Sequence, residues 1–181
     1  MEENQIRVTD KITEYFYDEQ RKWVAIEIRH LLSNTSGIKN YYALPEENRP
    51  TIDTVQECIQ FVNRLPLEFQ PGDGWSYSNT GYMMLASIVE QVSGLAYETF
   101  LQERFFHPLA MSATKANDPR HNPIGNAKGY ILSNDVWGEN ERSSLSKGPP
   151  GPGSTLSDLL RWSATLTEGR LLEESKLAEM W

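Results

Sequence analysis

The sequence predicts a mostly α-helical fold with one or two short strands, and three observations support this fold class. Apolar side chains recur every three or four residues in two stretches, 54–65 and 80–92, as they do on one face of a helix. Alternating, strand-like patterns are confined to short runs such as 128–132. Twelve glycines and ten prolines break the rest of the chain into loops.

The composition is that of a globular chain with an acidic surface. Of its 181 residues, 39% are hydrophobic and 23% are charged, which is enough apolar material for one core. The 25 acidic and 17 basic residues give a net charge of −8, and this balance provides no basic face for nucleic acid or an anionic membrane. No run approaches the roughly 18 apolar residues of a membrane span. No signal-peptide pattern follows Met1, so the localisation stays unknown.

The chain has a single cysteine, Cys58, which excludes an internal disulfide bond and a cluster of thiolate zinc ligands. Cys58 shares a helical apolar pattern with Val55, Ile59 and Val62. We therefore expect it to be a small buried hydrophobic side chain in the helix 54–65.

The first fifty residues are predicted to hold two short helices and a long loop. The segment 8–18 has apolar side chains at helical spacing, and a second helix of one or two turns is expected at 28–33. The segment 34–37 ends that helix, and within it Gly37 is free to adopt a positive φ. From 39 to 50 the chain is rich in tyrosine and bounded by proline, which indicates a loop.

Three further helices are predicted in the centre of the chain. The helix 54–65 ends before Pro66, which disfavours helical backbone at the residue preceding it. The helix 80–92 has the strongest apolar stripe and is closed by Gly94. The helix 97–106 follows after a short connection, so these two helices should pack against each other.

The last part of the chain is predicted to contain one strand and two helices. The strand is 128–132, and a helix begins after Thr155, with Asp158 three residues later as in a capping box. A final helical run starts at residue 173. Irregular structure is expected in three segments: 111–126, 134–147 and 148–153.

The stretch 69–82 carries the strongest candidate for a functional site. The turn sequence Pro-Gly-Asp-Gly at 71–74 delivers Trp75 and Tyr77 to the start of the strongest helix. Tyr77 and Asn79 therefore place a phenol and an amide at a helix N-terminus. Ordinary roles are open beside the functional ones: Tyr77 can simply pack, Asn79 can be an N-cap, and Trp75 can form a wall beside the site.

No residue pattern indicates a metal or cofactor site. His30, His107 and His121 have no partner at catalytic or metal-ligand spacing, so we expect all three to be structural or solvated. The sequence accordingly predicts no cofactor and no metal.

Three longer stretches together resemble a known family. In their order and spacing they are similar to the serine hydrolases that include class C β-lactamases, DD-peptidases of the penicillin-binding type and related esterases. The resemblance spans most of 25–181. The stretches are Ile28-Arg-His-Leu-Leu-Ser-Asn-Thr-Ser-Gly37, Phe69-Gln-Pro-Gly through Tyr77-Ser-Asn79-Thr-Gly-Tyr82 with Pro108-Leu-Ala-Met111 behind it, and Gly151-Pro-Gly-Ser-Thr155 with Asp158.

The resemblance implies a fold and a set of roles. The expected fold is the helical portion of the β-lactamase/transpeptidase-like α/β fold, with its central antiparallel sheet largely missing, so 1–181 is expected to be one incomplete domain. In this family a serine, helped by a lysine one helical turn later, forms an acyl-enzyme with an amide or ester substrate. The resemblance assigns the family's tyrosine general base and acid to Tyr77 and its substrate-orienting asparagine to Asn79.

Two of the family's motifs are not found at their places. The Ser-x-x-Lys helix is expected before Met1, and the strand with Lys-Thr-Gly or His-x-Gly is expected after Trp181. Three literal Ser-x-x-Lys strings occur, but none begins an apolar helix that would hold both side chains on one face, so we interpret them as chance matches. These strings are 36–39, 112–115 and 144–147.

Two hypotheses follow for the function. In the first, the chain is part of a serine hydrolase that acts on a β-lactam, a D-Ala peptide or an ester, and its partner is a small-molecule or peptide substrate. In the second, it is a non-catalytic relative that serves as a binding or interaction module. In either case, helix faces that lack a covering sheet favour self-association of the 181-residue piece. Ala110 also replaces the glycine usual in the family's Leu-Gly-Met turn.

Overall fold

The computed structural model describes residues 6–18, 20–115, 130–133, 135–139, 153–169, 172 and 174–180. It confirms the mostly helical fold class with short strands. The helices are α1 (Ile28–Leu32), α2 (Val55–Asn63), α3 (Asn79–Ser93), α4 (Tyr97–Leu101), α5 (Leu156–Thr167) and α6 (Glu174–Met180). The strands β1 (Tyr130–Ser133) and β2 (Val136–Glu139) form an antiparallel hairpin, and short 3₁₀ turns lie at Ile12–Glu14, Tyr41–Ala43 and Glu46–Asn48.

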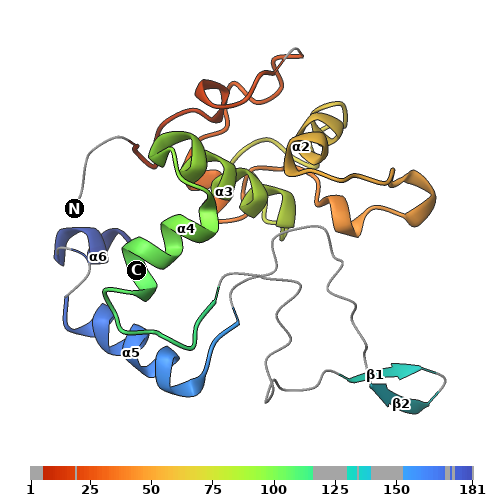
Figure 1. Ribbon diagram of the computed structural model, residues 1–181. Coiled ribbons are helices and arrows are strands. Elements are labelled where there is room, and N and C mark those ends of the chain that lie inside the picture. The colour runs from red at the N-terminus through yellow and green to blue at the C-terminus, as the bar shows by residue number, and fades with distance from the viewer. Residues whose placement is uncertain are drawn as a thin grey trace.

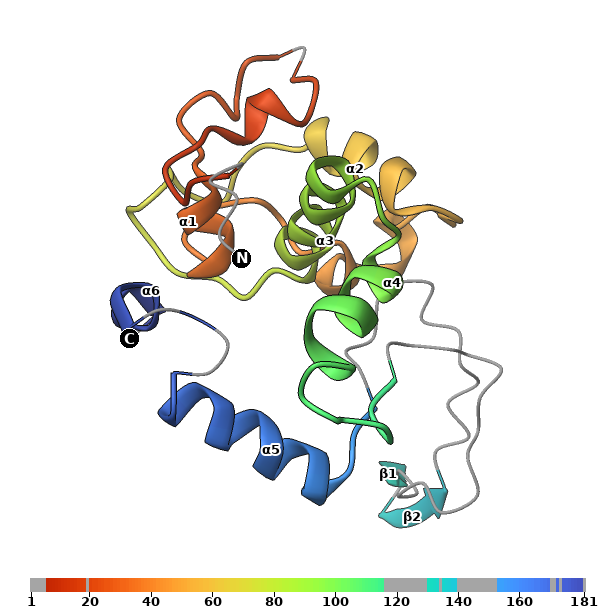
Figure 2. The ribbon, with the colours of Figure 1, turned by 60° about the vertical axis from the view of Figure 1, so that its left-hand side comes forward.

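Helix α3 is the central element of this arrangement (Figure 1). It contacts α1, α2 and α4, so the predicted packing of α3 against the helix that follows it is confirmed. Figure 2 shows that α5 and α6 lie apart from the group formed by α1, α2 and α3, and that the β1–β2 hairpin lies at the periphery. No helix among the described residues is both long enough and apolar enough to cross a membrane.

The hydrophobic core surrounds α3 and lies within the first half of the chain. The side chains of Met84 and Ile88, one turn apart on α3, are buried in it. Tyr82, in the first turn of α3, lies at the edge of this core and donates its hydroxyl to the Leu32 carbonyl at 3.1 Å. The core members are Ile12, Phe16, Trp23, Ile26, Ile28, Leu31, Ile38, Tyr41, Cys58, Ile59, Val62, Met83, Met84 and Ile88.

Helix α2 forms close to where the sequence places it. Thr54 is its N-cap: the Thr54 hydroxyl accepts from the Glu57 N–H at 3.1 Å, and the Glu57 carboxylate accepts from the Thr54 N–H at 3.2 Å. Cys58 is a buried free thiol, as expected. Burial raises the pKa of Cys58 to about 11, partly opposed by a hydrogen bond with Thr80, so the thiol stays protonated at neutral pH.

The helix predicted at 8–18 is wrong except for the 3₁₀ turn Ile12–Glu14. The backbone of this segment pairs with a segment farther along the chain instead of with itself. The Ile12 N–H donates to the Ile26 carbonyl at 3.1 Å, and the Ile28 N–H donates to the Asp10 carbonyl at 3.0 Å. These bonds use groups that a helix would need, so the apolar side chains reach the core from turns and one short 3₁₀ turn instead of an α-helix.

A strand forms near the predicted 128–132, but the prediction of an irregular segment at 134–147 needs a correction. Strand β1 begins at Tyr130, and residues 128 and 129 lie outside the described part of the chain. Strand β2, with Val136 and Trp137, forms inside the segment predicted to be irregular. Ser133 pairs with Val136 across a tight turn in which Asp135 has a φ of 60°. Val136 is β-branched and Trp137 is aromatic, so both favour strand conformation when the turn brings them beside β1.

The helix predicted at 97–106 forms, but its second half changes type. It begins as α4 and continues as a π-helical segment at Gln102–Phe106, in which the His107 N–H donates to the Gln102 carbonyl at 2.9 Å. The chain then turns at Ala110, whose φ is +54°. The Ala110 N–H donates to the His107 carbonyl at 3.0 Å and the Met111 N–H to the Phe106 carbonyl at 2.8 Å, the two bonds of a Schellman motif.

Replacing Ala110 with glycine is expected to stabilise the protein by about 0.5–1 kcal/mol, because a left-handed φ strains any residue that has a Cβ. Denaturant unfolding of the wild type and of Ala110→Gly measures the difference. Ala86→Gly is the matched control: Ala86 lies in the interior of α3, where the same change should cost about 1 kcal/mol. A loss of stability in Ala110→Gly would contradict the strain argument.

Helix α5 is capped as predicted, but only one half of the capping box forms. The Thr155 hydroxyl accepts from the Asp158 N–H at 3.3 Å. The Asp158 carboxylate turns away from Thr155 and accepts from the Ala113 N–H and the Thr114 hydroxyl, both at 2.9 Å, and from Arg161 at 2.6 Å. Asp158 therefore fastens α5 to the turn after the π-helical segment, a tertiary role that its spacing from Thr155 did not indicate.

The buried Asp158 carboxylate keeps its charge. Burial by itself would raise the pKa of Asp158, but the hydrogen bonds from Thr114 and the Ala113 N–H, together with the Arg161 guanidinium, outweigh it and hold the pKa below its ordinary value. The packing of the Phe105 ring on the Trp162 ring, with centroids 6.0 Å apart, adds a second contact between α5 and the preceding helices.

The outer face of α5 leaves apolar side chains in solvent. Leu156 is 82% exposed, and Leu159 and Leu160 are also exposed. This agrees with the expectation that helix faces lie uncovered in this chain. The self-association inferred from such faces stays a prediction.

Candidate active site

The loop before α3 is held by the segment that follows α1. The Glu68 N–H donates to the Gly37 carbonyl at 2.8 Å and the Gly72 N–H to the Thr35 carbonyl at 2.9 Å. Gly37 has the positive φ expected of it, +72°, and a Cβ there would lie 2.2 Å from the Phe69 carbonyl oxygen. Glycine is thus required at this position both for its φ and for the close approach of the two segments.

Tyr77 directly precedes the N-cap of α3. Ser78 is the cap, because its hydroxyl accepts from the Gly81 N–H at 3.2 Å, and Asn79 is the first helical residue. The alternative that Asn79 caps the helix is therefore wrong. Since its side chain is not needed for capping, the amide is available to other groups.

The structure brings the two predicted site residues together. The Tyr77 hydroxyl donates to the Asn79 amide oxygen at 3.2 Å, and the Asn79 amide nitrogen donates to the Asn40 amide oxygen at 3.4 Å. Asn40 is itself fixed, since its oxygen also accepts from the Tyr42 N–H at 3.2 Å. Tyr77 is 52% exposed, so its hydroxyl is oriented by the protein and remains accessible to a ligand. Such a phenol can exchange a proton with a group that approaches from solvent.

Two asparagines of this site were missed by the sequence analysis. Asn34 accepts hydrogen bonds from the residues on both sides of Tyr77, and Asn40 orients Asn79. The one available signal for Asn34 was its place directly after a helical run, where asparagine tolerates left-handed backbone. Nothing in the local sequence marks Asn40.

Trp75 does not pack as a wall beside the site. Its side chain is 68% exposed. The Phe69 ring lies instead beneath the turn, where a Cβ on Gly74 would approach it to 2.9 Å. Phe69 therefore supports the turn from inside, whereas Trp75 and Tyr77 are both exposed.

The described Ser-x-x-Lys strings do not form a nucleophile site. Ser36 is buried in a loop, and its hydroxyl accepts from the Ile38 N–H at 3.2 Å. Ser112 lies in the turn after the Schellman motif, and Lys115 pairs its backbone with Gly153. The third string, 144–147, lies outside the described residues. Neither described string begins a helix, in agreement with the interpretation of them as chance matches.

Of the two described histidines, His30 has a structural role and the His107 side chain is exposed, in line with the expectation of structural or solvated residues. His30 closes the first turn of α1, since its Nδ1 accepts from the Glu27 N–H at 3.0 Å. His107 follows the π-helical segment, and His121 lies outside the described residues. Burial, and then the Arg29 guanidinium, lower the pKa of His30 below its ordinary value of 6.5. Within the part of the chain that the structure describes, no group of His, Cys, Asp and Glu side chains gathers in a metal-binding arrangement.

The folded protein is expected to lose stability as the pH falls from about 7.5 to about 5.5, and His30→Gln should remove part of this loss. Because the pKa of His30 is lower in the folded than in the unfolded state, the unfolded chain takes up the proton first, so stability decreases on acidification through 6.5. Glutamine at this position can still accept from the Glu27 N–H, as in a capping box, but does not titrate. Denaturant midpoints at the two pH values measure the effect, and an equal pH dependence in both proteins would contradict it. Glu27, whose pKa is lowered chiefly by its hydrogen bond from Lys11, titrates below this window.

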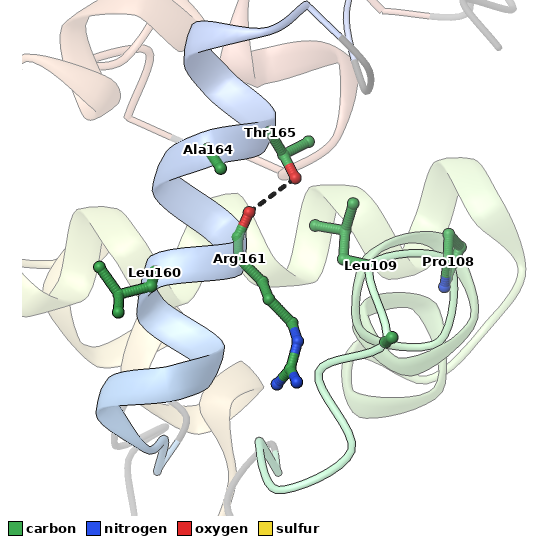
Figure 3. Close-up of a pocket in the computed structure, with 7 residues that line it drawn as sticks. Pro108, Leu109, Leu160, Arg161, Ala164 and Thr165 are labelled. Atoms are coloured by element: carbon green, nitrogen blue, oxygen red, sulfur yellow. Dashed lines mark hydrogen bonds between the residues drawn. The ribbon is translucent and has the colours of Figure 1, made fainter.

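A separate pocket lies between α5 and the Schellman turn (Figure 3). Its volume is about 650 Å³, and the Arg161 side chain extends from α5 toward the segment that carries Leu109. Neither Tyr77 nor Asn79 contributes to it. The lining residues are Pro108, Leu109, Ala110, Leu160, Arg161, Ala164 and Thr165.

A family model matches this chain over its whole length, and individual known proteins match between about half and nearly all of it. The family model described as Beta-lactamase matches residues 1–181. Penicillin-binding protein 4* of Bacillus subtilis (strain 168) is 35% identical over 102 residues, which are 54% of this chain and 23% of that protein. A D-aminopeptidase of Gluconobacter oxydans (strain 621H) is 27% identical over 154 residues, 78% of this chain and 28% of that protein. The solved structure of a D-stereospecific amidohydrolase from Streptomyces sp. superposes with a TM-score of 0.81 and 26% identity, covering 98% of this chain and 58% of that one.

The matched part of this chain is thus only 23% to 28% of the length of these curated relatives. The structural match covers 58% of the amidohydrolase. Together with the helices and the small hairpin described above, this coverage supports the predicted fold class, the helical portion of a larger α/β fold.

Proposed function

This chain belongs to the beta-lactamase family, and from that premise we propose that it forms one side of the active site of a serine amide hydrolase. The observation that carries the proposal is the hydrogen bond of 3.2 Å from the exposed Tyr77 hydroxyl to the Asn79 amide oxygen at the start of α3. Tyr77 acts as the general base and acid, and Asn79 orients the substrate. The serine nucleophile belongs to a segment outside these 181 residues.

The proposed reaction passes through an acyl-enzyme. The serine oxygen attacks the amide carbonyl carbon as the serine proton is relayed through the Tyr77 oxygen. Tyr77 then donates that proton to the amine nitrogen as the C–N bond breaks, which leaves an acyl ester on the serine. Water attacks this ester, Tyr77 accepts a proton from the water and returns it to the serine oxygen, and the carboxylic acid leaves.

Two arguments support the external nucleophile. Ser36 is buried and held by its own loop, and Ser112, in the turn after the π-helical segment, does not begin a helix that would hold it and Lys115 on one face. The Tyr77 side chain, in contrast, is exposed, so a further segment can approach it.

The amide is the proposed substrate class, and a residue of D configuration the proposed acyl part. One sequence relative is named a D-aminopeptidase and the matched solved structure a D-stereospecific amidohydrolase, and both names refer to amide bonds. β-Lactams and esters are the competing substrates within the same acyl-enzyme chemistry.

The test uses the full-length gene product that contains this chain. D-Phenylalanine 4-nitroanilide, its L enantiomer, a chromogenic cephalosporin and 4-nitrophenyl acetate are compared under the same conditions. The expected result is turnover of the D-anilide in preference to the other three, with an acyl adduct detected by mass spectrometry after rapid quenching. Absence of both turnover and adduct with all four compounds would refute the proposal and favour a non-catalytic binding module.

A further inference from the structure

Asn34 is bonded to both neighbours of Tyr77. The Asn34 carbonyl accepts from the Ser76 N–H at 3.0 Å, and the Asn34 side-chain oxygen accepts from the Ser78 N–H at 3.1 Å. One residue therefore fixes the backbone immediately before and immediately after Tyr77. Tyr77 lies between these two bonds with its side chain in solvent.

The position of Asn34 is itself determined by the end of α1. The Asn34 N–H donates to the Leu31 carbonyl at 3.3 Å, and the Thr35 N–H donates to the His30 carbonyl at 2.8 Å, which are the bonds of a Schellman motif. Asn34 occupies the left-handed position of this motif, with a φ of 58°. The Tyr77 loop is thus attached to the end of a short helix whose first residue, Ile28, and whose Leu31 are buried in the core.

Backbone conformation alone does not account for an asparagine here. Glycine adopts a positive φ more easily and would end α1 equally well. What glycine lacks is the oxygen that reaches Ser78, a residue only 2% exposed. Without that acceptor the Ser78 N–H would be buried at the start of α3 with no replacement for the bond, which costs the desolvation of that group. The side chain of Asn34 therefore has a task separate from its φ.

We propose that Asn34 is the positioning residue that holds Tyr77 in place for proton transfer, through its paired bonds to Ser76 and Ser78. The inference rests on the catalytic role proposed for Tyr77. Asn34 touches no reacting atom: it fixes the backbone from which the phenol projects, while Asn79 receives the hydroxyl. A displacement of about 1 Å in a catalytic group can cost about 10²-fold in rate. Weakening the bonds that fix this backbone should therefore lower kcat.

The test compares Asn34→Gly and Asn34→Asp in the full-length protein. Asn34→Gly keeps the left-handed backbone and removes the side-chain acceptor, whereas Asn34→Asp keeps an oxygen acceptor of the same reach. With D-phenylalanine 4-nitroanilide, Asn34→Gly is expected to lower kcat by about 10- to 100-fold with KM changed by less than about threefold. Asn34→Asp is expected to restore most of kcat. Ala110→Gly, the same relief of a positive φ at another helix end, is the control and should leave kcat unchanged.

Amide hydrogen exchange supplies a readout that does not depend on turnover. In Asn34→Gly the Ser78 N–H is expected to exchange at least about tenfold faster, while the Gly81 N–H, bonded to the Ser78 hydroxyl, stays protected. Wild-type activity that persists in Asn34→Gly overturns the positioning role and leaves the proposed function standing. Equal losses of kcat in Asn34→Gly and Asn34→Asp also overturn it. An inactive wild type refutes the proposed function itself, and the positioning role with it.

Discussion

Tyr77→Phe in the full-length protein is expected to lower kcat for the D-anilide by about 10²- to 10⁴-fold, the range typical of general acid–base catalysis. Phenylalanine keeps the ring and removes only the hydroxyl that bonds to Asn79 at 3.2 Å. The lost hydroxyl transfers a proton in the transition state and does not bind the substrate, so KM should change by less than about threefold. Steady-state kinetics over a range of substrate concentrations separate the two parameters.

Tyr82→Phe is the matched control for this experiment. Tyr82 lies in the first turn of α3, the helix that Tyr77 precedes, is similarly exposed, and also uses its hydroxyl in one hydrogen bond, at 3.1 Å to the Leu32 carbonyl. Removal of that hydroxyl loses a bond at the edge of the core and no group at the proposed site. If both substitutions lowered kcat equally, Tyr77 would have no special role in proton transfer.

Trp23→Ala is expected to destabilise the protein by about 3–5 kcal/mol, the largest effect on stability expected from a single change. Trp23 is 1% exposed and belongs to the same core cluster as Ile12, Ile26 and Leu31. Its removal leaves a cavity in the core on which α3 also packs, so the surrounding side chains cannot fill the space without loss of contacts. A domain with an ordinary stability of about 5–15 kcal/mol would lose a large share of it.

The control for the core is a second tryptophan. Trp75 is mostly in solvent, so Trp75→Ala should change the free energy of unfolding by no more than about 0.5 kcal/mol. Denaturant unfolding followed by circular dichroism measures both variants against the wild type. A small effect in Trp23→Ala would mean that the packing around α3 is not the main source of stability.

The sequence predicted those elements whose signals are local. Thr54 and Thr155 cap α2 and α5 through bonds to residues three positions away, and the apolar period of α3 extends over its length. Gly37 was expected to have a positive φ, and it does. In contrast, the segment 8–18 has a helical apolar pattern but pairs its backbone with 26–28, and no local pattern can report such a partner.

The same division applies to the candidate site. Tyr77 and Asn79 were predicted as a pair, because residues two positions apart at the start of a helix must lie close together in space. The structure confirms that they meet, and their chemical roles stay a proposal. Asn34 and Asn40 were not predicted, because Asn34 meets Ser78 across 44 positions and Asn40 meets Asn79 across 39.

By itself, then, the sequence determined the approximate places of α1 to α6, two of their caps and the Tyr77–Asn79 pair, since each depends on residues within about one or two turns of one another. Only the tertiary structure decided that Asn34 binds both sides of Tyr77, that Asn40 orients Asn79, and that Asp158 fastens α5 to Thr114. The physical reason is that a hydrogen bond between distant segments depends on how the whole core packs, and packing is a property of the assembled chain.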